Sequence, residues 1–327
     1  MTATRVIVLV AVVAGLLTGC GAPGGRSLPD RLTGGSAVAR HQVAWADGRA
    51  VHLGDRVVRA PGDIDQLALT AGGLYLRVNR RLLVVDGDEV RDTGQRLHGS
   101  FVVAPGGRYL AYLDRTHGPR DRFGTHRLTT ALWDLRTREL VGSSSSGMGD
   151  TGSDDLYDLY AESEVRVLGF TRSDLVVDTA DGYRRLALTD GRERGLDLGP
   201  GERPLVATQE GFATSADRVG GRWRVDTFDG RLAVLSPSRR FLLVSDDGIG
   251  WTVTERGRPT RVPGLPHVIQ PGPWLDDHTL AVIAFDGDQD PVAILRCDLD
   301  ARRCSDVVRG TVLGEAPVLG SRGAGEI

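Results

Sequence analysis

Three cysteines carry the most reactive side chains of this sequence, and two of them lie close together. Cys297 and Cys304 stand seven positions apart in CDLDARRC. A structural zinc site needs four ligands, typically in closer pairs, and no histidine lies near enough in the sequence to complete one. An exported chain keeps such a pair oxidised, so we predict a disulfide. Cys20 is left as a single thiol near the N-terminus.

Alternating carboxylates in FDGDQDP form a weak candidate for calcium binding. Asp286, Asp288 and Asp290 have the spacing of a D-x-D-x-D loop. However, Pro291 stands where an EF-hand loop has its glycine, and no glutamate closes the loop at its twelfth position. We therefore favour a solvated hairpin turn between LAVIAF and VAILRC, and we predict no metal site.

Sequence signatures of common enzymes are missing. The chain has no Gly-x-Ser-x-Gly elbow, no His-Glu-x-x-His, no P-loop and no dinucleotide fingerprint. Its seven histidines are scattered and give no positive evidence of a metal site. We predict a protein that is not an enzyme and uses no cofactor.

Two polar stretches with aromatic residues are the best candidates for recognition. The first, residues 115–127, is cationic, and the second, residues 142–164, is anionic. Function often lies on loops carried by a rigid scaffold, and arginine and tyrosine are favoured at interfaces. The alternative is that the loops are mobile or pair with each other. The predicted partner-binding residues are Arg115, Arg120, Arg122, Phe123, Arg127, Asp154, Asp155, Tyr157 and Tyr160.

The N-terminus has the pattern of an export signal. MTATR carries one positive charge, and Val6–Leu17 is an apolar run of twelve residues, too short to span a bilayer. LLTGC, which follows, resembles the lipobox of bacterial lipoproteins. That resemblance implies cleavage before Cys20 and attachment of diacylglycerol to its thiol, which would anchor the chain. The alternatives are an ordinary secretory peptide, or a short anchor, with an incidental cysteine.

Composition divides the rest of the chain. Residues 20–37 are rich in glycine, proline and serine and are predicted to be a flexible tether. Residues 38–314 are predicted to fold, and residues 315–327 form a C-terminal tail. Without residues 1–19, which contain Arg5 alone, the chain has 39 basic and 43 acidic residues, a net charge of −4. This balance does not indicate a nucleic-acid partner.

Short apolar runs separated by turn residues indicate an all-β protein. A unit of strand, turn and return strand recurs about every 40 residues, which is typical of four-stranded propeller blades. Dividing the 308 residues from Cys20 onward by about 44 per blade predicts seven blades. The units start near Val51, Leu82, Leu132, Leu186, Trp223, Trp251 and Ile294.

Two of these units resemble WD40-like and TolB-like β-propellers. VAPGGRYLAYL and LSPSRRFLLVS resemble the family's SPDG-x-x-L-A turn and strand, and Trp133-Asp134 resembles its WD dipeptide. The resemblance implies a propeller over residues 38–314. Only two of its blades contain the motifs of the family. It implies nothing about function. In this register Cys297 and Cys304 would staple the outer hairpin of the final blade.

These observations predict a membrane-anchored extracytoplasmic lipoprotein in the cell envelope. Its non-catalytic propeller would bind a protein or an envelope component, and the lipid on Cys20 would bind the membrane. The alternative is an envelope enzyme or small-ligand receptor with a polar or metal site in the propeller channel. A structural envelope component with weak binding is a third possibility. Which membrane holds the chain is left open.

Overall fold

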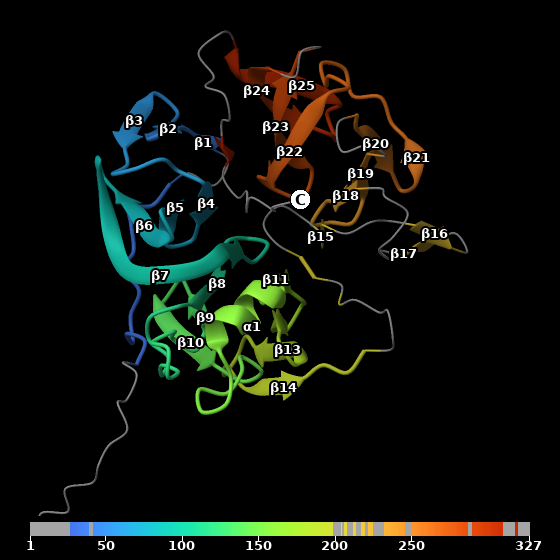
Figure 1. Cartoon of the computed structure of the whole chain (residues 1–327). Coiled ribbons are helices and arrows are strands. Elements are labelled where there is room, and N and C mark those ends of the chain that lie inside the picture. The colour runs from blue at the N-terminus through green and yellow to red at the C-terminus, as the bar shows by residue number, and fades with distance from the viewer. Residues whose placement is uncertain are drawn as a thin grey trace, which may run out of the picture.

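A ring of antiparallel sheets makes up the computed structural model (Figure 1). The first strand of each large sheet lies toward the centre of the ring and the last lies at its periphery. This is the arrangement of a β-propeller with four-stranded blades, as predicted. The structure describes residues 27–38, 42–198, 204, 206–207, 212–213, 217–219, 222–224, 232–245, 250–286, 290–309 and 318–319.

Sheet order follows chain order almost everywhere. The first sheet is β26 (Val318–Leu319), β1 (Ala44–Asp47), β2 (Ala50–Leu53) and β3 (Arg56–Arg59). The second has seven strands: β4 (Gln66–Thr70), β5 (Gly73–Val78), β6 (Arg81–Asp86), β7 (Glu89–Val103), β8 (Tyr109–Asp114), β9 (Thr129–Asp134) and β10 (Glu139–Ser144).

The remaining sheets continue the ring. One consists of β11 (Arg166–Phe170), β12 (Asp174–Thr179), β13 (Gly182–Ala187) and β14 (Glu193–Gly195). The next has β15 (Phe212–Ala213), β18 (Leu232–Leu235), β19 (Phe241–Ser245), β20 (Thr252–Glu255) and β21 (Arg258–Pro259), with a separate hairpin of β16 (Asp217–Val219) and β17 (Arg222–Arg224). The last is β22 (Ile269–Trp274), β23 (Thr279–Phe285), β24 (Pro291–Asp298) and β25 (Arg303–Arg309).

Strand β7 belongs to two blades. Its first part pairs with β6, for example Val90 with Val85, and its second part pairs with β8, for example Val103 with Leu110. The seven-stranded sheet is therefore two four-stranded units joined by one long strand. The sheets in the described part of the chain do not confirm the predicted count of seven blades.

The two ends of the domain meet in one sheet. β26 pairs with β1, with Trp45 opposite Leu319 and Ala46 opposite Val318. Leu319 is buried in a cluster with Trp45 and Ile283. The predicted boundary at residue 314 is therefore too early, because the strand that closes the ring follows it.

The start of the domain also differs from the prediction. Residues 28–36 fall within the predicted flexible tether of residues 20–37, but they pack against the sheet of β4–β10. Leu28 and Leu32 are buried in the same cluster as Trp133 and Tyr112. This part of the glycine-rich segment therefore belongs to the folded domain.

Six of the seven predicted hairpins are present. They are β2–β3, β6–β7, β9–β10, β13–β14, β20–β21 and β24–β25. At the seventh, near Trp223, β17 pairs with the preceding strand β16. The predicted return strand after Arg224 lies outside the described residues.

The two SPDG-like segments form turns that are closed by equivalent backbone hydrogen bonds. The N–H of Ala104 donates to the carbonyl of Tyr109 at 2.9 Å, and that of Ser236 donates to the carbonyl of Phe241 at 2.8 Å. The fourth position of each turn has a positive φ, 73° at Gly107 and 58° at Arg239. An arginine therefore occupies the left-handed conformation that glycine adopts in the first turn.

An arginine clamp follows each of these turns. Arg108 donates to Oδ2 of Asp134 from Nε at 2.9 Å and from Nη2 at 2.6 Å. At the equivalent place Arg240 donates to Glu255, with Nε 2.9 Å and Nη2 2.7 Å from Oε1. Asp134 and Glu255 end the strands β9 and β20, so each clamp ties a turn to the second strand that follows it in the chain.

A buried series of hydrogen bonds lies in the same blade as the first clamp. The indole Nε1 of Trp133 donates to the hydroxyl of Tyr112 at 3.2 Å, and that hydroxyl donates to Oε1 of Gln95 at 2.9 Å. Trp133 and Tyr112 are fully buried, and burial raises the pKa of Tyr112 well above its ordinary value. These bonds satisfy the donors of both Trp133 and Tyr112.

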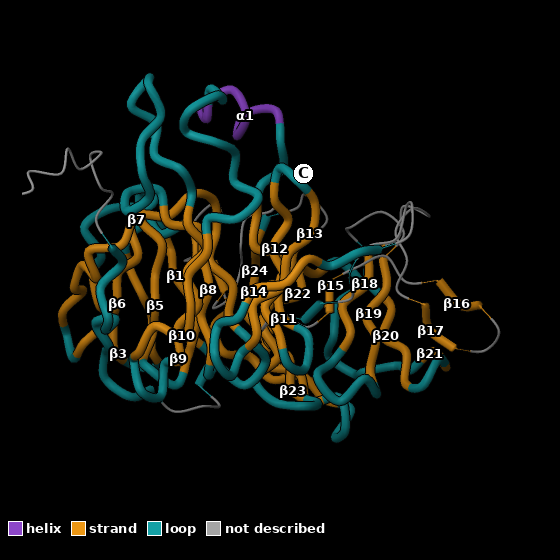
Figure 2. Tube along the Cα trace, turned by 90° about the horizontal axis from the view of Figure 1, so that it is seen from below, coloured by secondary structure: helices purple, strands orange, loops and turns teal. Residues whose placement is uncertain are grey.

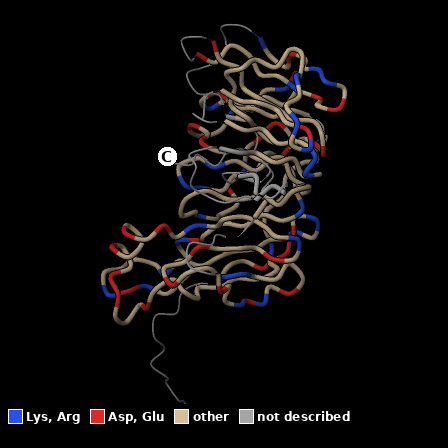
Figure 3. The backbone as a smooth tube through the Cα atoms, turned by 90° about the vertical axis from the view of Figure 1, so that its right-hand side faces the viewer, with Lys and Arg blue, Asp and Glu red and all other residues tan. Residues whose placement is uncertain are grey.

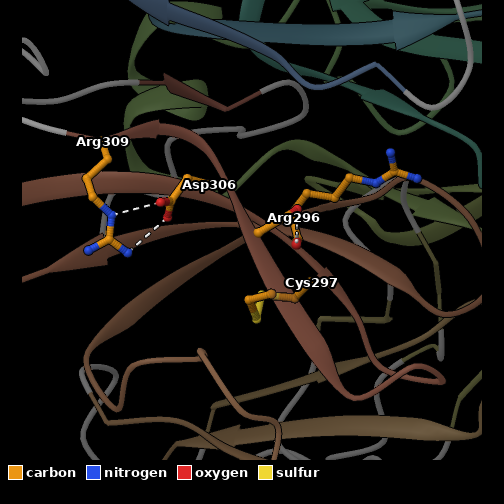
Figure 4. Close-up of a disulfide and its surroundings, with 6 residues drawn as sticks. Arg296, Cys297, Asp306 and Arg309 are labelled. Atoms are coloured by element: carbon orange, nitrogen blue, oxygen red, sulfur yellow. Dashed lines mark hydrogen bonds and ion pairs between the residues drawn. A yellow bond between two sulfur atoms is a disulfide. The ribbon is translucent and has the colours of Figure 1, made fainter.

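The predicted disulfide is present between β24 and β25 (Figure 4). Cys297 and Cys304 are directly opposite each other in the strand register. Cys297 is buried in the core of this sheet, while Cys304 is half-buried. The bond holds the outer hairpin of its blade, as predicted. It does not cross the ring closure, which β26 makes with β1 in the neighbouring sheet.

Reduction of this disulfide is expected to lower the free energy of unfolding by about 2–3 kcal/mol, because a short loop is released in the unfolded chain. Denaturant unfolding with and without reductant measures the loss. The Cys297→Ala/Cys304→Ala double variant is the control and should not respond to reductant. An unchanged midpoint in the wild type, with both thiols shown to be free, would contradict the prediction.

Adjacent glycines of the first SPDG-like turn should differ in their tolerance of alanine. Both have positive φ, 82° at Gly106 and 73° at Gly107. A Cβ on Gly106 would meet no atom within 4 Å, whereas one on Gly107 would lie 3.1 Å from Cα of Thr70. Gly106→Ala should cost about 1 kcal/mol from backbone strain alone. Gly107→Ala should cost about 1 kcal/mol more, from the added contact. Equal denaturation midpoints for the two variants would refute this reading of the turn.

Candidate functional site

Both predicted recognition loops leave the same end of one blade. The first connects β8 to β9, whose residues Asp114 and Thr129 are paired. The second follows β10, where Ser144 is paired with Thr130 of β9. Because β9 is antiparallel to both neighbours, the two connections start side by side. We call residues 115–128 and 145–165 together the insertion platform. Figure 2 shows its helix, α1 (Leu156–Glu162), projecting beyond the strand ends on one face of the ring.

A buried carboxylate joins the two loops. Asp121 is 6% exposed, and its Oδ1 accepts hydrogen bonds from the N–H groups of Phe123 and Thr125 at 2.9 and 2.8 Å. Its Oδ2 accepts one from the N–H of Leu156, at the start of α1, at 3.0 Å. Burial by itself raises the pKa of Asp121, but these backbone donors outweigh it and hold the pKa below its ordinary value.

Tyr160 makes the second connection. Its hydroxyl donates to the carbonyl of Met148 at 2.7 Å and accepts from the N–H of Leu128 at 3.0 Å. Its ring lies against His98 of β7, with 5.9 Å between the centroids. Burial raises the pKa of Tyr160. This predicted partner-binding residue therefore holds the platform together, with its hydroxyl occupied on both sides.

Two predicted acidic residues also have local structural roles. Asp155 caps α1, because its Oδ1 accepts from the N–H groups of Tyr157 and Asp158 at 3.1 and 3.3 Å. Oδ2 of Asp154 accepts from the N–H of Asp150 at 2.7 Å, in the turn before the helix. These contacts shape the loop that presents α1.

The predicted cationic residues are distributed along the first loop. Arg115, Arg120 and Arg122 are exposed, and Arg127 is half-buried with a buried Nε that has no hydrogen-bond acceptor. Nε of Arg120 donates to Nε2 of His126 at 2.8 Å, and Nδ1 of His126 lies 2.6 Å from the carbonyl of Gly118. His126 therefore carries its proton on Nδ1 and accepts on Nε2. Through these two hydrogen bonds its ring links both sides of the loop.

Two large side chains remain exposed on the platform. Phe123 is 58% exposed and Tyr157 is 71% exposed, more than the other large apolar side chains that the structure describes. The guanidinium of Arg122 lies over the ring of Phe123, 4.6 Å from its centroid. Since Asp121 and Tyr160 hold the backbone on either side, both aromatic rings are presented from fixed loops.

Charge on the platform is divided between its two parts. The first loop exposes arginines, whereas the second exposes acids at Asp150, Asp158, Glu162 and Glu164. Figure 3 shows the positions of acidic residues, in red, gathered with a few basic ones, in blue, along the protruding part of the backbone. The platform can thus meet a partner surface that has both an apolar recess and mixed charge.

The other candidate sites are less complete. Asp286 and Asp290 lie at the turn between β23 and β24, where Oδ1 of Asp286 accepts from the N–H of Asp290 at 3.1 Å. Asp288 and the predicted lipidation site Cys20 lie outside the described residues. Within the described part of the chain, no three His, Cys, Asp or Glu side chains are grouped so as to hold a metal ion. No helix described by the structure is long and apolar enough to cross a membrane.

Asp121 was not among the residues predicted from the sequence. The turn in which Asp121 accepts from Phe123 and Thr125 has a recognisable sequence signal, since Asp followed by Gly three positions later is typical of turns. Its bond to Leu156 spans 35 residues and leaves no sequence signal. Asp121 is therefore a positioning residue for the exposed aromatic rings.

Acidification should release α1 from the first loop. The pKa of the Asp121 carboxyl is lower in the folded protein than in the unfolded chain. Its stabilising effect is therefore complete at neutral pH and is lost as the pH falls below about 4, through the lowered pKa. The protection factors of the Leu156 and Thr125 amides against hydrogen exchange, measured relative to the intrinsic rate at each pH, should fall over this range. In Asp121→Asn these protection factors should be low at every pH, whereas the exposed Asp158→Asn serves as control. Wild-type protection in Asp121→Asn would contradict this role.

Comparison with known proteins shows no family membership. No family model matches the chain, and no curated protein matches it. Among solved structures, it is similar to BamB from Moraxella catarrhalis, with 14% identity, a TM-score of 0.38, and coverage of 89% of this chain and 94% of that chain. It is also similar to a Bacteroides caccae protein (10% identity, TM-score 0.37, coverage 86% and 99%) and to oligogalacturonate lyase from Vibrio parahaemolyticus (10% identity, TM-score 0.35, coverage 87% and 78%).

Proposed function

We propose that this chain is a membrane-anchored extracytoplasmic lipoprotein whose non-catalytic, seven-bladed propeller binds a protein of the cell envelope. The observation that carries the proposal is the exposure of Phe123 and Tyr157 on the insertion platform. Asp121 and Tyr160 hold the backbone of the loops that carry both rings, so little backbone conformational entropy is lost when the rings are covered. Aromatic and arginine side chains dominate the binding energy of protein interfaces.

Two features support a location outside the cytoplasm. The Cys297–Cys304 disulfide is typical of proteins from oxidising compartments. The N-terminal sequence with LLTGC supports export and lipidation at Cys20. The lipid would hold the propeller at a membrane, while the platform supplies the surface for the protein partner.

In-cell photo-crosslinking from position 157 tests the proposal. A crosslinkable amino acid replaces Tyr157, and a second strain carries it at Val57, which is 52% exposed on β3. One stoichiometric envelope protein should be captured from position 157 and not from position 57. The Cys20→Ala form, lacking the anchor, should lose it.

Affinity for the captured partner then measures the two rings directly. Phe123→Ser and Tyr157→Ser should each weaken binding by about 30-fold, the effect of losing an interface hot spot. Val57→Ser, which removes an exposed apolar side chain elsewhere, should bind like the wild type. Unchanged affinity in both platform variants, or capture of nothing, would overturn the proposal and direct attention to the channel as an enzymatic or small-ligand site.

A further inference from the structure

Part of the segment predicted to be a flexible tether is docked on the folded domain. Residues 28–36, which we call the strap, add to the outer edge of β10. Arg31 forms an antiparallel bridge with Glu139. On either side, the N–H of Leu32 donates to the carbonyl of Arg138 at 2.9 Å, and the N–H of Leu140 donates to the carbonyl of Asp30 at 3.3 Å. The strap therefore covers a strand edge that would otherwise be open.

Its second half crosses to the neighbouring blade. The hydroxyl of Tyr75 on β5 donates to the carbonyl of Thr33 at 3.0 Å, and the N–H of Gly35 donates to the carbonyl of Gly72 at 2.9 Å. Ser36 ends the strap, because its Oγ donates to Oδ1 of Asp86 at 2.7 Å and accepts from the N–H of Gly87 at 2.9 Å. The strap thus joins two blades.

The glycines of the strap are required by close approach. A Cβ on Gly35 would lie 2.0 Å from the carbonyl oxygen of Val85, and one on Gly34 would lie 2.2 Å from Nε of Arg138. The Cβ position of Gly73 faces Gly35 in turn, 3.0 Å from its Cα. A side chain at position 35 is therefore incompatible with the docked strap.

The strap lies away from the insertion platform. Arg138 stands in the turn between β9 and β10, at the opposite end of β9 from the first loop of the platform. Only seven residues, 21–27, separate Cys20 from Leu28. Fully extended, seven residues reach about 25 Å.

We infer that the strap fixes the point at which the membrane anchor holds the propeller, so that the outer edge of β10 is the part of the ring kept next to the lipid surface. This rests on the proposed lipidation of Cys20. Without the strap, nine more residues would be free, which adds about 30 Å of reach and removes any preferred edge.

Protease sensitivity tests the docking and does not depend on the lipid. Trypsin cleaves after arginine, and Arg26 and Arg31 stand on either side of the start of the strap. The bond after Arg31 should be cut at least about tenfold more slowly than the bond after Arg26, since cleavage there requires local opening. Gly35→Val should remove this difference, while Gly25→Val, outside the strap, should keep it. Equal rates in the wild type would overturn the inference.

Energy transfer tests the orientation. The full lipidated protein is reconstituted in vesicles that carry an acceptor on their headgroups. A donor is placed on Arg136→Cys, in the β9–β10 turn, or on Arg258→Cys, on β21 across the ring. Transfer should be stronger from position 136. Gly35→Val should abolish the difference between the two sites, and so should a nine-residue Gly-Ser insertion after Arg26, which leaves the strap intact.

The outcomes separate the two proposals. Equal transfer from both sites in wild-type vesicles would overturn the orientation while leaving the lipid anchor in place. Failure of the wild type to join vesicles, with the Arg31 bond still protected, would overturn the anchor and with it the assigned lipid-facing edge. The insertion variant keeps the test decisive even where Gly35→Val does not fold.

Discussion

The pairing of β26 with β1 closes the ring and so constrains the positions of the blades between them. It joins residues 44–47 to residues 318–319 at opposite ends of the domain. Gly272 of β22 makes room for it, because a Cβ there would lie 2.5 Å from Cδ1 of Leu319. Pairing so far apart in sequence forms only when the intervening sheets have brought the ends together. Its free energy of formation therefore reflects the packing of every blade.

Features that repeat within one blade could be predicted from the sequence, since their residues are close along the chain. The hairpins follow from short apolar runs and turn residues, and the two SPDG-like turns from local motifs. The clamps of Arg108 and Arg240 reuse one solution with different carboxylates, Asp134 and Glu255. β26 lacks the pattern of an apolar run between turn residues, because it is only two apolar residues in a glycine-containing tail. It becomes a strand by pairing with β1.

Location and role were not equally predictable at the candidate site. Recognition was predicted in the two insertions, and these do form one platform. Their side chains could not be assigned, because aspartate and tyrosine serve equally well as structural or interface residues. Asp155 and Tyr160 are structural, while Tyr157, three positions before Tyr160, is exposed. Residues three apart on a helix lie only about 60° apart around its axis, so the sequence spacing does not tell which of the two tyrosines packs and which points out.

The strap shows why composition alone predicted a tether. Glycine makes a backbone more flexible, but it also permits close backbone contacts, and Gly35 serves the second purpose against the carbonyl of Val85. Leu28 and Leu32, four residues apart and both buried, distinguish a docked segment from a solvated one. The position of the strap in the chain also matters, because it precedes β1. The contacts of the strap with β10 and β5 therefore bear a pull on the N-terminus before the short β1–β26 pairing that closes the ring does.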